Sequence, residues 1–524
     1  MRKVISRQEA AALVQDGMTL GMLGFVTLSV PEELLVSLEE RFLAEGHPRD
    51  LNVFYTSAIG DGGEHGANHL AHAGLVRRMV GAHVGLAPKL NPLITGNQIE
   101  TFCAPQGVLV HMCRAMAGHK CGVITHVGLK TFCDPEVEAC CFNDAARKAH
   151  TEGRGIVQSI EIDGRRLLHY KLTPPDVCFI KATYGDSRGN LSMEKAGLFL
   201  EQLEMALAPK NNGGTVIAQV DTLVEDNTLD PRSVKVHGCF VDYVVVGRPE
   251  YSRQHYFDAV PYHPEWTGEV RVPMGALEPM ELGIRKIIAR RGAMELRRDC
   301  LVNLGFGMPD GVASVAGEEG VAGEMTLSIE SGTLGGVPAP GNGCGASADV
   351  EAIVKHTEIF DGYDGGSIDI AYLGAAQIDR HGNVNVSKFA GRMTGPGGFI
   401  NITQNAKKIC FMGTFSSVKD TDIRLENGRL NIVKDSNVVK FVPEVEQITF
   451  SGAYAARRGQ HVLYVTERAV FALTPEGVEL KEIAPGVDLQ RDILDQMDFQ
   501  PIIRKVRAMD PRIFRPEPMG LTLP

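Results

Sequence analysis

The chain has 524 residues, a formal net charge of −11 at pH 7 and a pI near 5.8. Its length exceeds what a single hydrophobic core fills, so we expect two domains or three. The acidic balance argues against general binding to nucleic acid or to acidic membranes.

The amino-terminal stretch and the cysteines favour a cytoplasmic protein. The opening MRKVISRQEAAALVQDG has neither a long apolar core nor a small-residue cleavage site, so we expect no signal peptide. No stretch approaches the roughly 18 unbroken apolar residues that predict a membrane span. The 11 cysteines are scattered and never spaced C-x-x-C, which favours reduced thiols over a disulfide framework or a zinc knuckle.

The predicted elements, in chain order, alternate between helices and short aliphatic strands. The first helix is expected after Ser6, which has capping-box spacing to Glu9. A later helix over 278–296 carries the i,i+4 pair of Glu281 and Arg285. Near-continuous apolar strands between helices predict an α/β fold with mostly parallel sheets covered on both faces. The expected strands span 19–25, 177–184, 214–220, 243–247, 300–306, 368–378 and 407–415.

The two halves of the chain repeat each other. AAALVQDGMTLGMLGFVTLSVPEELL in the first half and GAMELRRDCLVNLGFGMPDGVASV in the second both run helix, strand, glycine turn and proline. D-x-x-G-N follows a strand in each half, at Asp186 and at Asp379. One copy alone is a common turn sequence, but two echoes in the same order predict two related open α/β domains. We expect domains over 1–247 and 276–524, a Pro-, Tyr- and His-rich linker over 248–275, and an active site between the halves.

Glu330 ends an apolar run and precedes the glycine-rich loop SGTLGGVPAPGNGCGA. Loops at the carboxyl ends of parallel strands hold the active sites of α/β proteins, and glycine lets several backbone N–H groups approach one point. A carboxylate beside such donors is typical of a carboxylate nucleophile, although a surface glutamate before a turn has the same pattern. The sequence has no nucleotide P-loop, no Rossmann fingerprint at this loop and no G-x-S-x-G serine nucleophile.

Three further stretches have the composition of ligand-binding turns. NLGFGMPDG, residues 303–311, fits either an anion cradle at a helix start or a plain βα turn. GPGGFINITQN, residues 395–405, clusters glycines as expected where the backbone approaches a ligand or a neighbouring chain. Gln106 stands before an apparent helix, where it either caps that helix or offers an amide donor to a substrate.

A histidine cluster resembles a metal site but lacks the remaining ligands. His65, His69 and His72 would share one side of a helix, and only Glu64 accompanies them. We therefore interpret them as ordinary helix residues and expect no metal site.

Six separated stretches together resemble the single-chain family I coenzyme A transferases. They are SIESGTLGGVP, PQGVL, VGLKTFCDP, IDRHGNVNVSKF, GPGGFINITQN and the carboxyl-terminal VTERAVFAL…EIAPGVDLQRDILDQMDF. The resemblance spans nearly the whole chain and favours the bacterial propionate/acetate CoA-transferase type, which acts on short-chain acids.

The resemblance implies a role for each candidate residue. Glu330 would attack an acyl-CoA thioester and then carry CoA as a glutamyl thioester until a second acid takes it, in ping-pong fashion. Gln106 would hold the substrate or its oxyanion near Glu330. Coenzyme A would be a substrate, with no permanently bound cofactor. The remaining expected contacts with CoA are Gly305, Phe306, Gly307, Met308, Pro309, Gly397, Gly398 and Asn383, and those with the acyl group are Gly24, Gly343 and Gly345.

Two segments depart from the family pattern and leave the preferred acid open. Cys344 stands where relatives are expected to carry an aromatic residue, so it either widens the acyl pocket or is covered by a neighbour. VTLSVPEEL varies in the segment expected to face the acyl group. Two other functions remain open, an acyl-CoA hydrolase on the same scaffold and a non-catalytic CoA or sugar-phosphate binding module. The family also implies a homo-oligomer, either a dimer or a tetramer.

Overall fold

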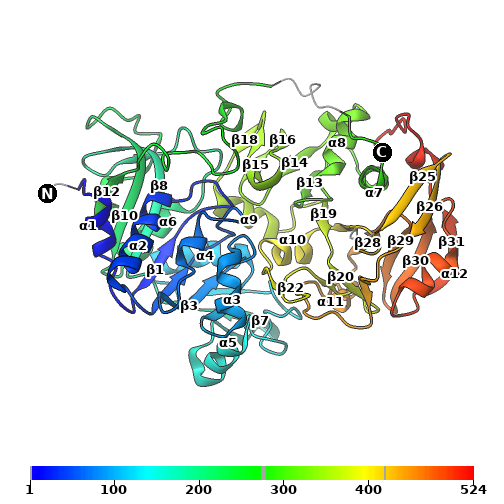
Figure 1. Ribbon diagram of the computed structural model, residues 1–524, viewed down its shortest axis with the longest axis horizontal. Coiled ribbons are helices and arrows are strands. Elements are labelled where there is room, and N and C mark those ends of the chain that lie inside the picture. The colour runs from blue at the N-terminus through cyan, green and yellow to red at the C-terminus, as the bar shows by residue number, and fades with distance from the viewer. Residues whose placement is uncertain (1–2, 273–278, 418–420) are drawn as a thin grey trace.

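The computed structural model describes residues 3–272, 279–417 and 421–524 and places two lobes side by side, each built on one large sheet (Figure 1). The predicted α/β class with mostly parallel sheets is confirmed. The predicted division at 247 and 276 stays a prediction, and position 276 lies outside the described residues.

The first sheet runs in the order β11-β9-β8-β1-β2-β3-β4, and β10 pairs with β8 and β12. Its pairs are parallel except those that β9 makes with β8 and β11. Its strands are β1 (Thr19–Met22), β2 (Leu51–Phe54), β3 (Val76–Gly81), β4 (Glu100–Cys103), β8 (Val177–Asp186), β9 (Leu191–Ser192), β10 (Thr215–Val224), β11 (Val234–Val236) and β12 (Tyr243–Val246). The helices of this half are α1 (Arg7–Ala12), α2 (Glu32–Glu45), α3 (Asn91–Thr95), α4 (Gln106–Ala117), α5 (Asp144–Ala149) and α6 (Gln202–Lys210).

The second sheet runs in the order β18-β15-β14-β13-β19-β24-β28-β29-β30-β31. The pairs from β14 across to β28 are parallel. Its strands are β13 (Leu301–Leu304), β14 (Thr326–Ser328), β15 (Thr333–Leu334), β18 (Ala352–Ile353), β19 (Ile370–Gly374), β24 (Lys408–Met412), β28 (His461–Val465), β29 (Ala469–Thr474), β30 (Gly477–Ile483) and β31 (Ile502–Ala508). The helices of this half are α7 (Ile284–Ala293), α8 (Gly311–Glu318), α9 (His356–Asp364), α10 (Phe399–Asn405), α11 (Gly452–Arg457) and α12 (Leu489–Asp492).

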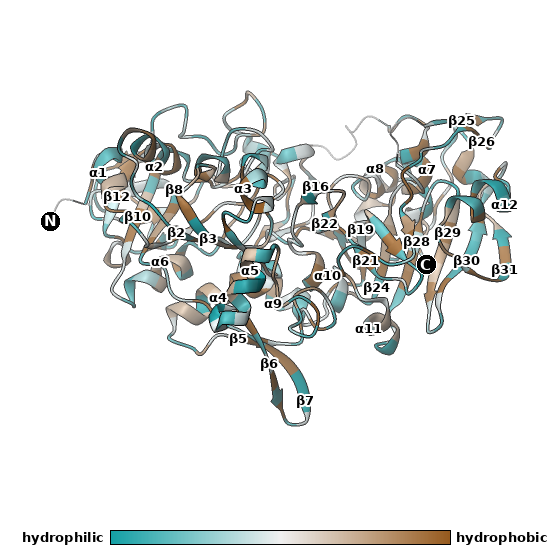
Figure 2. Ribbon diagram, turned by 60° about the horizontal axis from the view of Figure 1, so that its bottom comes forward, coloured by the Kyte–Doolittle hydropathy of each residue, from teal (hydrophilic) through white to brown (hydrophobic). Residues whose placement is uncertain are grey.

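Both lobes also contain short sheets of two or three strands. The hairpin of β6 and β7 in the first half projects from the body of the molecule (Figure 2). The short strands are β5 (Val123–Thr125), β6 (Val157–Ile162), β7 (Arg165–Tyr170), β16 (Val337–Pro338), β17 (Ser347–Ala348), β20 (Gln377–Asp379), β21 (Val384–Asn385), β22 (Lys388–Phe389), β23 (Arg392–Met393), β25 (Asp422–Glu426), β26 (Arg429–Lys434) and β27 (Phe441–Val442). None of the helices in the described ranges is long and apolar enough to cross a membrane.

Helices cover both faces of the second sheet. One face packs on α7 and α8 through a core that includes Ile288 and Val315, and the other packs on α9 and α10 through Phe360 and Ile402. The buried core of the first half also includes Ile400 of α10. The lobe boundary is therefore packed with apolar side chains, and α10 belongs to both lobes.

The predicted repeat is visible in equivalent strands. β1 lies between β8 and β2, and β13 lies in the same way between β19 and β14. Beyond β1, the Leu23 N–H donates to the Phe179 carbonyl at 3.2 Å, and beyond β13 the Gly305 N–H donates to the Tyr372 carbonyl at 2.7 Å. Each half therefore turns out of its sheet after an equivalent strand.

The two D-x-x-G-N copies form the same turn. In the second half, Oδ1 of Asp379 accepts the Asn383 N–H at 3.0 Å, and the Asn383 amide donates to Oδ2 at 2.9 Å. Asp186 and Asn190 repeat both bonds, at 2.9 and 2.7 Å. The remaining oxygen of Asn383 accepts the Gly452 N–H at 2.9 Å. Both polar atoms of the Asn383 side chain thus take part in hydrogen bonds of the fold, and its contact with CoA stays a prediction.

The predicted helix over 278–296 is shorter than expected. It begins as α7 only after Gly283, whose backbone is extended, with φ −162° and ψ −170°. Glu281 therefore lies outside the helix, and Arg285 instead donates to Asp310 and to the Gly307 carbonyl. By contrast, the capping box of Ser6 and Glu9 at α1 is confirmed.

Replacing Asn383 by Ala removes its bonds to Asp379 and to the Gly452 amide, and Asn190→Ala removes bonds of the same kind in the first half. We expect each substitution to lower the free energy of unfolding by about 1–3 kcal/mol, because buried partners lose their hydrogen bonds. Urea denaturation measures the loss. An unchanged free energy of unfolding in either variant would contradict the structural role of these turns.

Candidate active site

Glu330 lies in the turn that joins β14 to the antiparallel strand β15. The Ile329 N–H donates to the Thr333 carbonyl at 3.1 Å and closes this turn. Gly332 has φ +109°, and a Cβ there would lie 2.2 Å from the carbonyl oxygen of Val354. Only glycine fits this position, so the Glu330 turn is held in one conformation by close backbone packing.

The loop after Glu330 folds back onto both the turn and the first half. The Ser331 hydroxyl donates to the Gly345 carbonyl at 2.5 Å. A Cβ on Gly345 would lie 2.6 Å from the ring of Phe25, and one on Gly343 would lie 3.1 Å from Trp266. Gly343 and Gly345 are therefore packing positions and lie outside the cavity lining described below, which differs from the predicted acyl contact.

Several backbone N–H groups of this loop are already engaged. Those of Gly332, Gly335 and Gly343 donate to the carbonyls of Ile329, Leu327 and Pro340 at 3.0, 2.8 and 3.1 Å. The expectation that the glycine loop surrounds Glu330 with free amides is wrong for these three groups. These three N–H groups are therefore not free to stabilise an oxyanion.

The amino terminus of α4 docks directly on the second half. The Gln106 N–H donates to the Gly397 carbonyl at 3.0 Å, and the Gly107 N–H donates to Oδ1 of Asn401 at 3.1 Å. A helix leaves its first N–H groups without partners inside the helix, and here the other lobe supplies those partners. This docking carries Gln106 from the first half into the site of the second.

Glu330 and Gln106 line one cavity of about 220 Å³ between the lobes. Most of its wall is apolar, and it receives residues from both halves. Of the predicted site residues, it brings together Glu330, Gln106, Gly305, Phe306, Gly397, Gly398 and Cys344. The other lining residues are Phe25, Val26, Ala58, His83, Leu86, Asn303, Gly341, Asn342, Leu373, Pro396, Phe399 and Ile402.

The glycines at 397 and 398 lie between the two principal side chains. A Cβ on Gly398 would lie 3.2 Å from Cγ of Glu330, and one on Gly397 would lie 3.7 Å from Oε1 of Gln106. Gly397 also has φ +52°. The predicted close approach of backbone at this loop is therefore found around the catalytic candidates themselves.

Burial dominates the electrostatics of Glu330. It raises the pKa of the carboxyl above its ordinary value, while a hydrogen bond with backbone and the side chain of Asn303 act in the opposite direction. Burial, with the Glu330 charge beside it, also raises the pKa of the Cys344 thiol. A thiol with a raised pKa stays protonated and is a poor nucleophile, so Cys344 is a small apolar wall of the cavity.

Besides Gly343, Gly345 and Asn383, four predicted positions lie outside the cavity lining. Gly24 faces Val30 and Ile59, where a Cβ would lie 3.0 and 3.3 Å from their side chains. The turn beyond Phe306 bends away, and the carbonyl of Gly307 accepts a bond from Arg285. Only the first two residues of the predicted CoA-contacting turn line the cavity, and the positions outside its lining are Gly24, Gly307, Met308 and Pro309.

Sequence reasoning missed three polar residues at this site. Asn303 is fully buried on β13 and lines the cavity, and a lone amide within an apolar strand was the available signal. His356 contacts Gln106, with 2.9 Å between Nε2 atoms, and its Nδ1 lies 2.8 Å from Glu201. Because Glu201 and His356 are 155 positions apart in the chain, no local pattern connects them.

The histidine cluster of the first half ties loops to α2. His69 and His72 are not on an α-helix; Nε2 of His69 lies 2.7 Å from Glu32, and Nε2 of His72 lies 2.7 Å from Glu39. Burial lowers the pKa of His69, but the Glu32 and Glu39 carboxylates outweigh it and raise that pKa overall. His65 bonds to a different carboxylate, so the three rings do not converge on one point.

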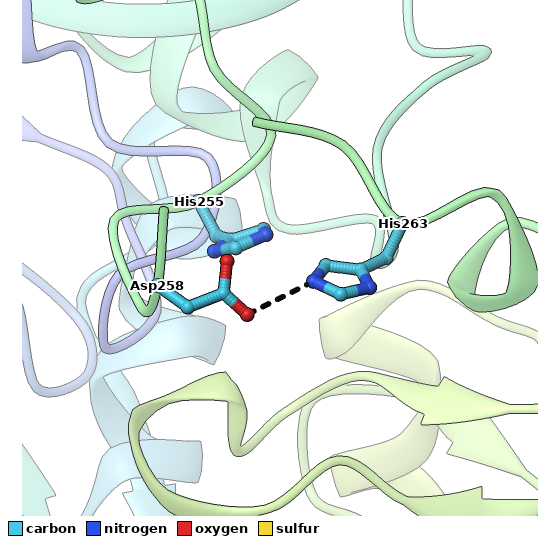
Figure 3. A group of neighbouring side chains, drawn as sticks. All are labelled: His255, Asp258 and His263. Atoms are coloured by element: carbon cyan, nitrogen blue, oxygen red, sulfur yellow. Dashed lines mark hydrogen bonds and ion pairs between the residues drawn. The ribbon is translucent and has the colours of Figure 1, made fainter. Parts of the chain in front are cut away.

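A second histidine cluster, in the segment predicted as the linker, contains His255, Asp258 and His263 (Figure 3). Nδ1 of His255 accepts the Phe257 N–H at 3.0 Å, so the neutral ring carries its proton on Nε2. Both nitrogens of His263 lie near carboxylates, 3.1 Å from Asp258 and 2.8 Å from Glu265. Asp258 and His263 are therefore hydrogen-bonded to each other, and the one lone pair of the neutral His255 ring already accepts the Phe257 N–H.

Comparison with known proteins places the chain in a family. A family model described as Coenzyme A transferase matches residues 4–247. The caffeate CoA-transferase of Acetobacterium woodii is 44% identical over 99% of both chains. The chain belongs to the coenzyme A transferase family. The acetate CoA-transferase YdiF of Escherichia coli O157:H7 is 39% identical over 99% of this chain and 97% of its own.

Solved structures of relatives share the whole architecture of this coenzyme A transferase. A crystal structure of the acyl-CoA transferase YdiF from Escherichia coli O157:H7, in a thioester complex with CoA, has a TM-score of 0.92 and 38% identity. The match covers 100% of this chain and 98% of that chain. The resemblance to the coenzyme A transferases, the α/β fold and the assignment as a CoA-transferase are confirmed.

Gly107→Ala tests the joint between the lobes. The new methyl group would lie 2.4 Å from Nδ2 of Asn401 and 2.5 Å from the ring of Phe360. We expect the free energy of unfolding to fall by about 1–3 kcal/mol, as for other overpacked sites, in urea denaturation. Gly317 in α8 has no neighbouring atom within 4 Å, so Gly317→Ala is the matched control and gains about 0.5–1 kcal/mol. Equal effects of the two substitutions would contradict the close docking of α4.

Proposed function

We propose that this enzyme transfers coenzyme A from a short-chain acyl-CoA to a second carboxylic acid through a thioester on Glu330. The shared cavity carries the proposal, because Glu330 from one half and Gln106 from the other line it together. Family membership supports the reaction class, and the thioester complex of the related YdiF supports a covalent route.

The proposed chemistry has two matched half-reactions. The Glu330 carboxylate attacks the thioester carbonyl, which forms an acyl-glutamyl anhydride and releases CoA thiolate. The thiolate then attacks the glutamyl carbonyl, and the products are the glutamyl-CoA thioester and the first free acid. The second acid runs the same steps in reverse and leaves as its CoA thioester. Each half-reaction breaks one thioester and forms another, and the anhydride between them keeps the acyl group activated, so no energy is lost to hydrolysis.

Each step passes through a tetrahedral oxyanion that needs hydrogen-bond donors. Gln106 and Asn303 both line the cavity beside Glu330, but the Asn303 amide already donates to the Ser328 carbonyl at 3.4 Å and to the Tyr363 hydroxyl at 3.2 Å. The apolar remainder of the wall, which includes Phe25, Phe399 and Ile402, lowers the local dielectric and strengthens those bonds. We therefore assign oxyanion stabilisation to the Gln106 amide.

The class of acid follows from the cavity and the relatives. An acyl group must fit the apolar space of about 220 Å³ beside Glu330. The relatives carry the names caffeate CoA-transferase and acetate CoA-transferase. We propose a short-chain acid such as acetate or propionate, while one methylene in an apolar pocket discriminates by only about 1–3 kcal/mol.

We also propose the substrates, the location and the oligomeric state of the enzyme. Acyl-CoA and free carboxylates are its substrates, and no permanently bound cofactor takes part in the steps above. The free, scattered cysteines favour a cytoplasmic location. We propose a homo-oligomer of two or four chains, as the family implies.

Glu330→Gln keeps the size of the side chain but removes the nucleophile. We expect acyl exchange between acetyl-CoA and propionate to fall by at least about 10⁴-fold, while acyl-CoA still binds in isothermal titration calorimetry. Glu351 is exposed and lies outside the cavity lining, so Glu351→Gln is the control and should keep the wild-type rate. Substantial exchange by Glu330→Gln would remove this residue from its role.

The pH dependence of thioester formation reports the ionisation of Glu330. Only the ionised carboxylate attacks, and burial raises its pKa, so the rate should fall as the pH decreases through a value above 4.5. Rapid-quench measurement of the first turnover gives this acid limb. Burial also raises the pKa of Asp364, to about 7, and Asp364→Asn is therefore the control that should leave the limb in place. A limb at or below 4.5, or one that Asp364→Asn removes, would contradict the assignment.

A further inference from the structure

A chain of three buried polar side chains crosses the lobe boundary and ends at the cavity. Nδ1 of His356 lies 2.8 Å from Oε2 of Glu201, and its Nε2 lies 2.9 Å from Nε2 of Gln106. Glu201 and His356 are 0% exposed and Gln106 is 2% exposed. Glu201 and Gln106 belong to the first half, and His356 begins α9 in the second.

The donors and acceptors of this chain define one arrangement. Glu201 remains a carboxylate, because His356 and hydrogen bonds lower its pKa although burial acts in the opposite direction. An ionised carboxylate only accepts, so His356 carries its proton on Nδ1 and offers the lone pair of Nε2. That lone pair accepts one of the two N–H bonds of the Gln106 amide. No second acceptor for this amide is found among the described residues, and Gln106 lines the cavity.

The imidazole ring of His356 is itself held in place. Its ring packs edge-on against Phe25, with 5.8 Å between centroids, and against Phe360 at 5.3 Å. Its backbone N–H donates to the Phe199 carbonyl at 2.8 Å. The orientation of the Gln106 amide is therefore determined by a ring that has little freedom to turn.

Stability alone does not account for this chain. Burying a carboxylate costs free energy that a neighbouring charge offsets only in part, and an apolar replacement of similar volume is often as stable. Oε1 of Glu201 lacks a hydrogen-bond partner among the described residues. A cost of this kind at a lobe boundary, directly behind a cavity residue, points to a role in the reaction.

We propose that Glu201 and His356 are positioning residues that orient the Gln106 amide, so that its free N–H meets the oxyanion formed at Glu330. The inference rests on the proposed function, because it gives Gln106 the donor role in CoA transfer. Glu201 and His356 act through Gln106 and touch no reacting atom. They also make the donor depend on correct assembly of both halves.

His356→Phe tests the proposal, because it keeps an aromatic ring between Phe25 and Phe360 but removes the acceptor. We expect kcat for acyl exchange to fall by about tenfold to a hundredfold, as for a misplaced catalytic group, with KM for acyl-CoA unchanged within about twofold. His356→Gln returns an acceptor oxygen and should recover most of kcat. Steady-state exchange and the rate of thioester formation on Glu330 give the two readouts.

A double-mutant cycle with Gln106→Ala separates positioning from a general loss of packing. If His356 acts through Gln106, the double variant should be no slower than Gln106→Ala alone. His111 is the control, because this histidine lies on α4 and contacts α9 from the other side of the same helix pair, 3.6 Å from Asp361. His111→Asn should keep the wild-type kcat.

Different outcomes overturn different statements. The positioning role would be overturned by any of three results. The first is a double variant whose rate loss is the product of the two single losses, the second is a rise in KM that accounts for the loss, and the third is full kcat in His356→Phe. If His356→Phe does not fold, as judged by thermal melting, Glu201→Gln tests the same chain and should show a smaller loss confined to kcat. The proposed function fails separately if the wild-type enzyme forms no thioester on Glu330.

Discussion

The site depends on the docking of one helix terminus. The first N–H groups of α4 donate to Gly397 and Asn401 of the other lobe at 3.0 and 3.1 Å. Without these bonds, two buried helix donors would lack partners, which costs roughly 1–3 kcal/mol each. The same contacts bring Gln106 beside Glu330 and close the cavity between the lobes. Assembly of the two halves and formation of the active site are therefore one event.

Desolvation gives the assembled site its chemical character. The cavity wall is mostly apolar and Glu330 is partly buried within it, so its carboxylate loses hydration and its pKa rises. A less hydrated carboxylate is a better nucleophile toward a thioester, and exclusion of water protects the anhydride and thioester intermediates. The hydrogen-bonded side chains of Glu201 and His356 orient the Gln106 amide in the same site, toward the point where negative charge develops.

Much of the fold and several residues of the site could be predicted from local sequence patterns. Glu330, Gln106 and Gly397 stand in short motifs at the ends of strands or helices, and such motifs keep their meaning when the fold is unknown. Asn383 also has a structural role, because D-x-x-G-N forms the same self-contained turn in both halves. His356 and Glu201 were missed because a pair joined only by tertiary contact leaves no periodic signal in the sequence. The backbone N–H groups of Gly332 and Gly335 are already hydrogen-bonded. The number of glycines in a loop therefore does not predict how many of its N–H groups are free to donate.

The central claim is that Glu330 carries coenzyme A covalently, and peptide mapping by mass spectrometry tests it most directly. The enzyme is incubated with acyl-CoA, treated with borohydride to reduce a glutamyl thioester, and digested. The account predicts that the peptide containing Glu330 loses the mass expected for conversion of its carboxyl group to an alcohol, and that omission of acyl-CoA leaves this peptide unchanged. An unmodified Glu330 peptide, or the same change on another residue, would contradict the account.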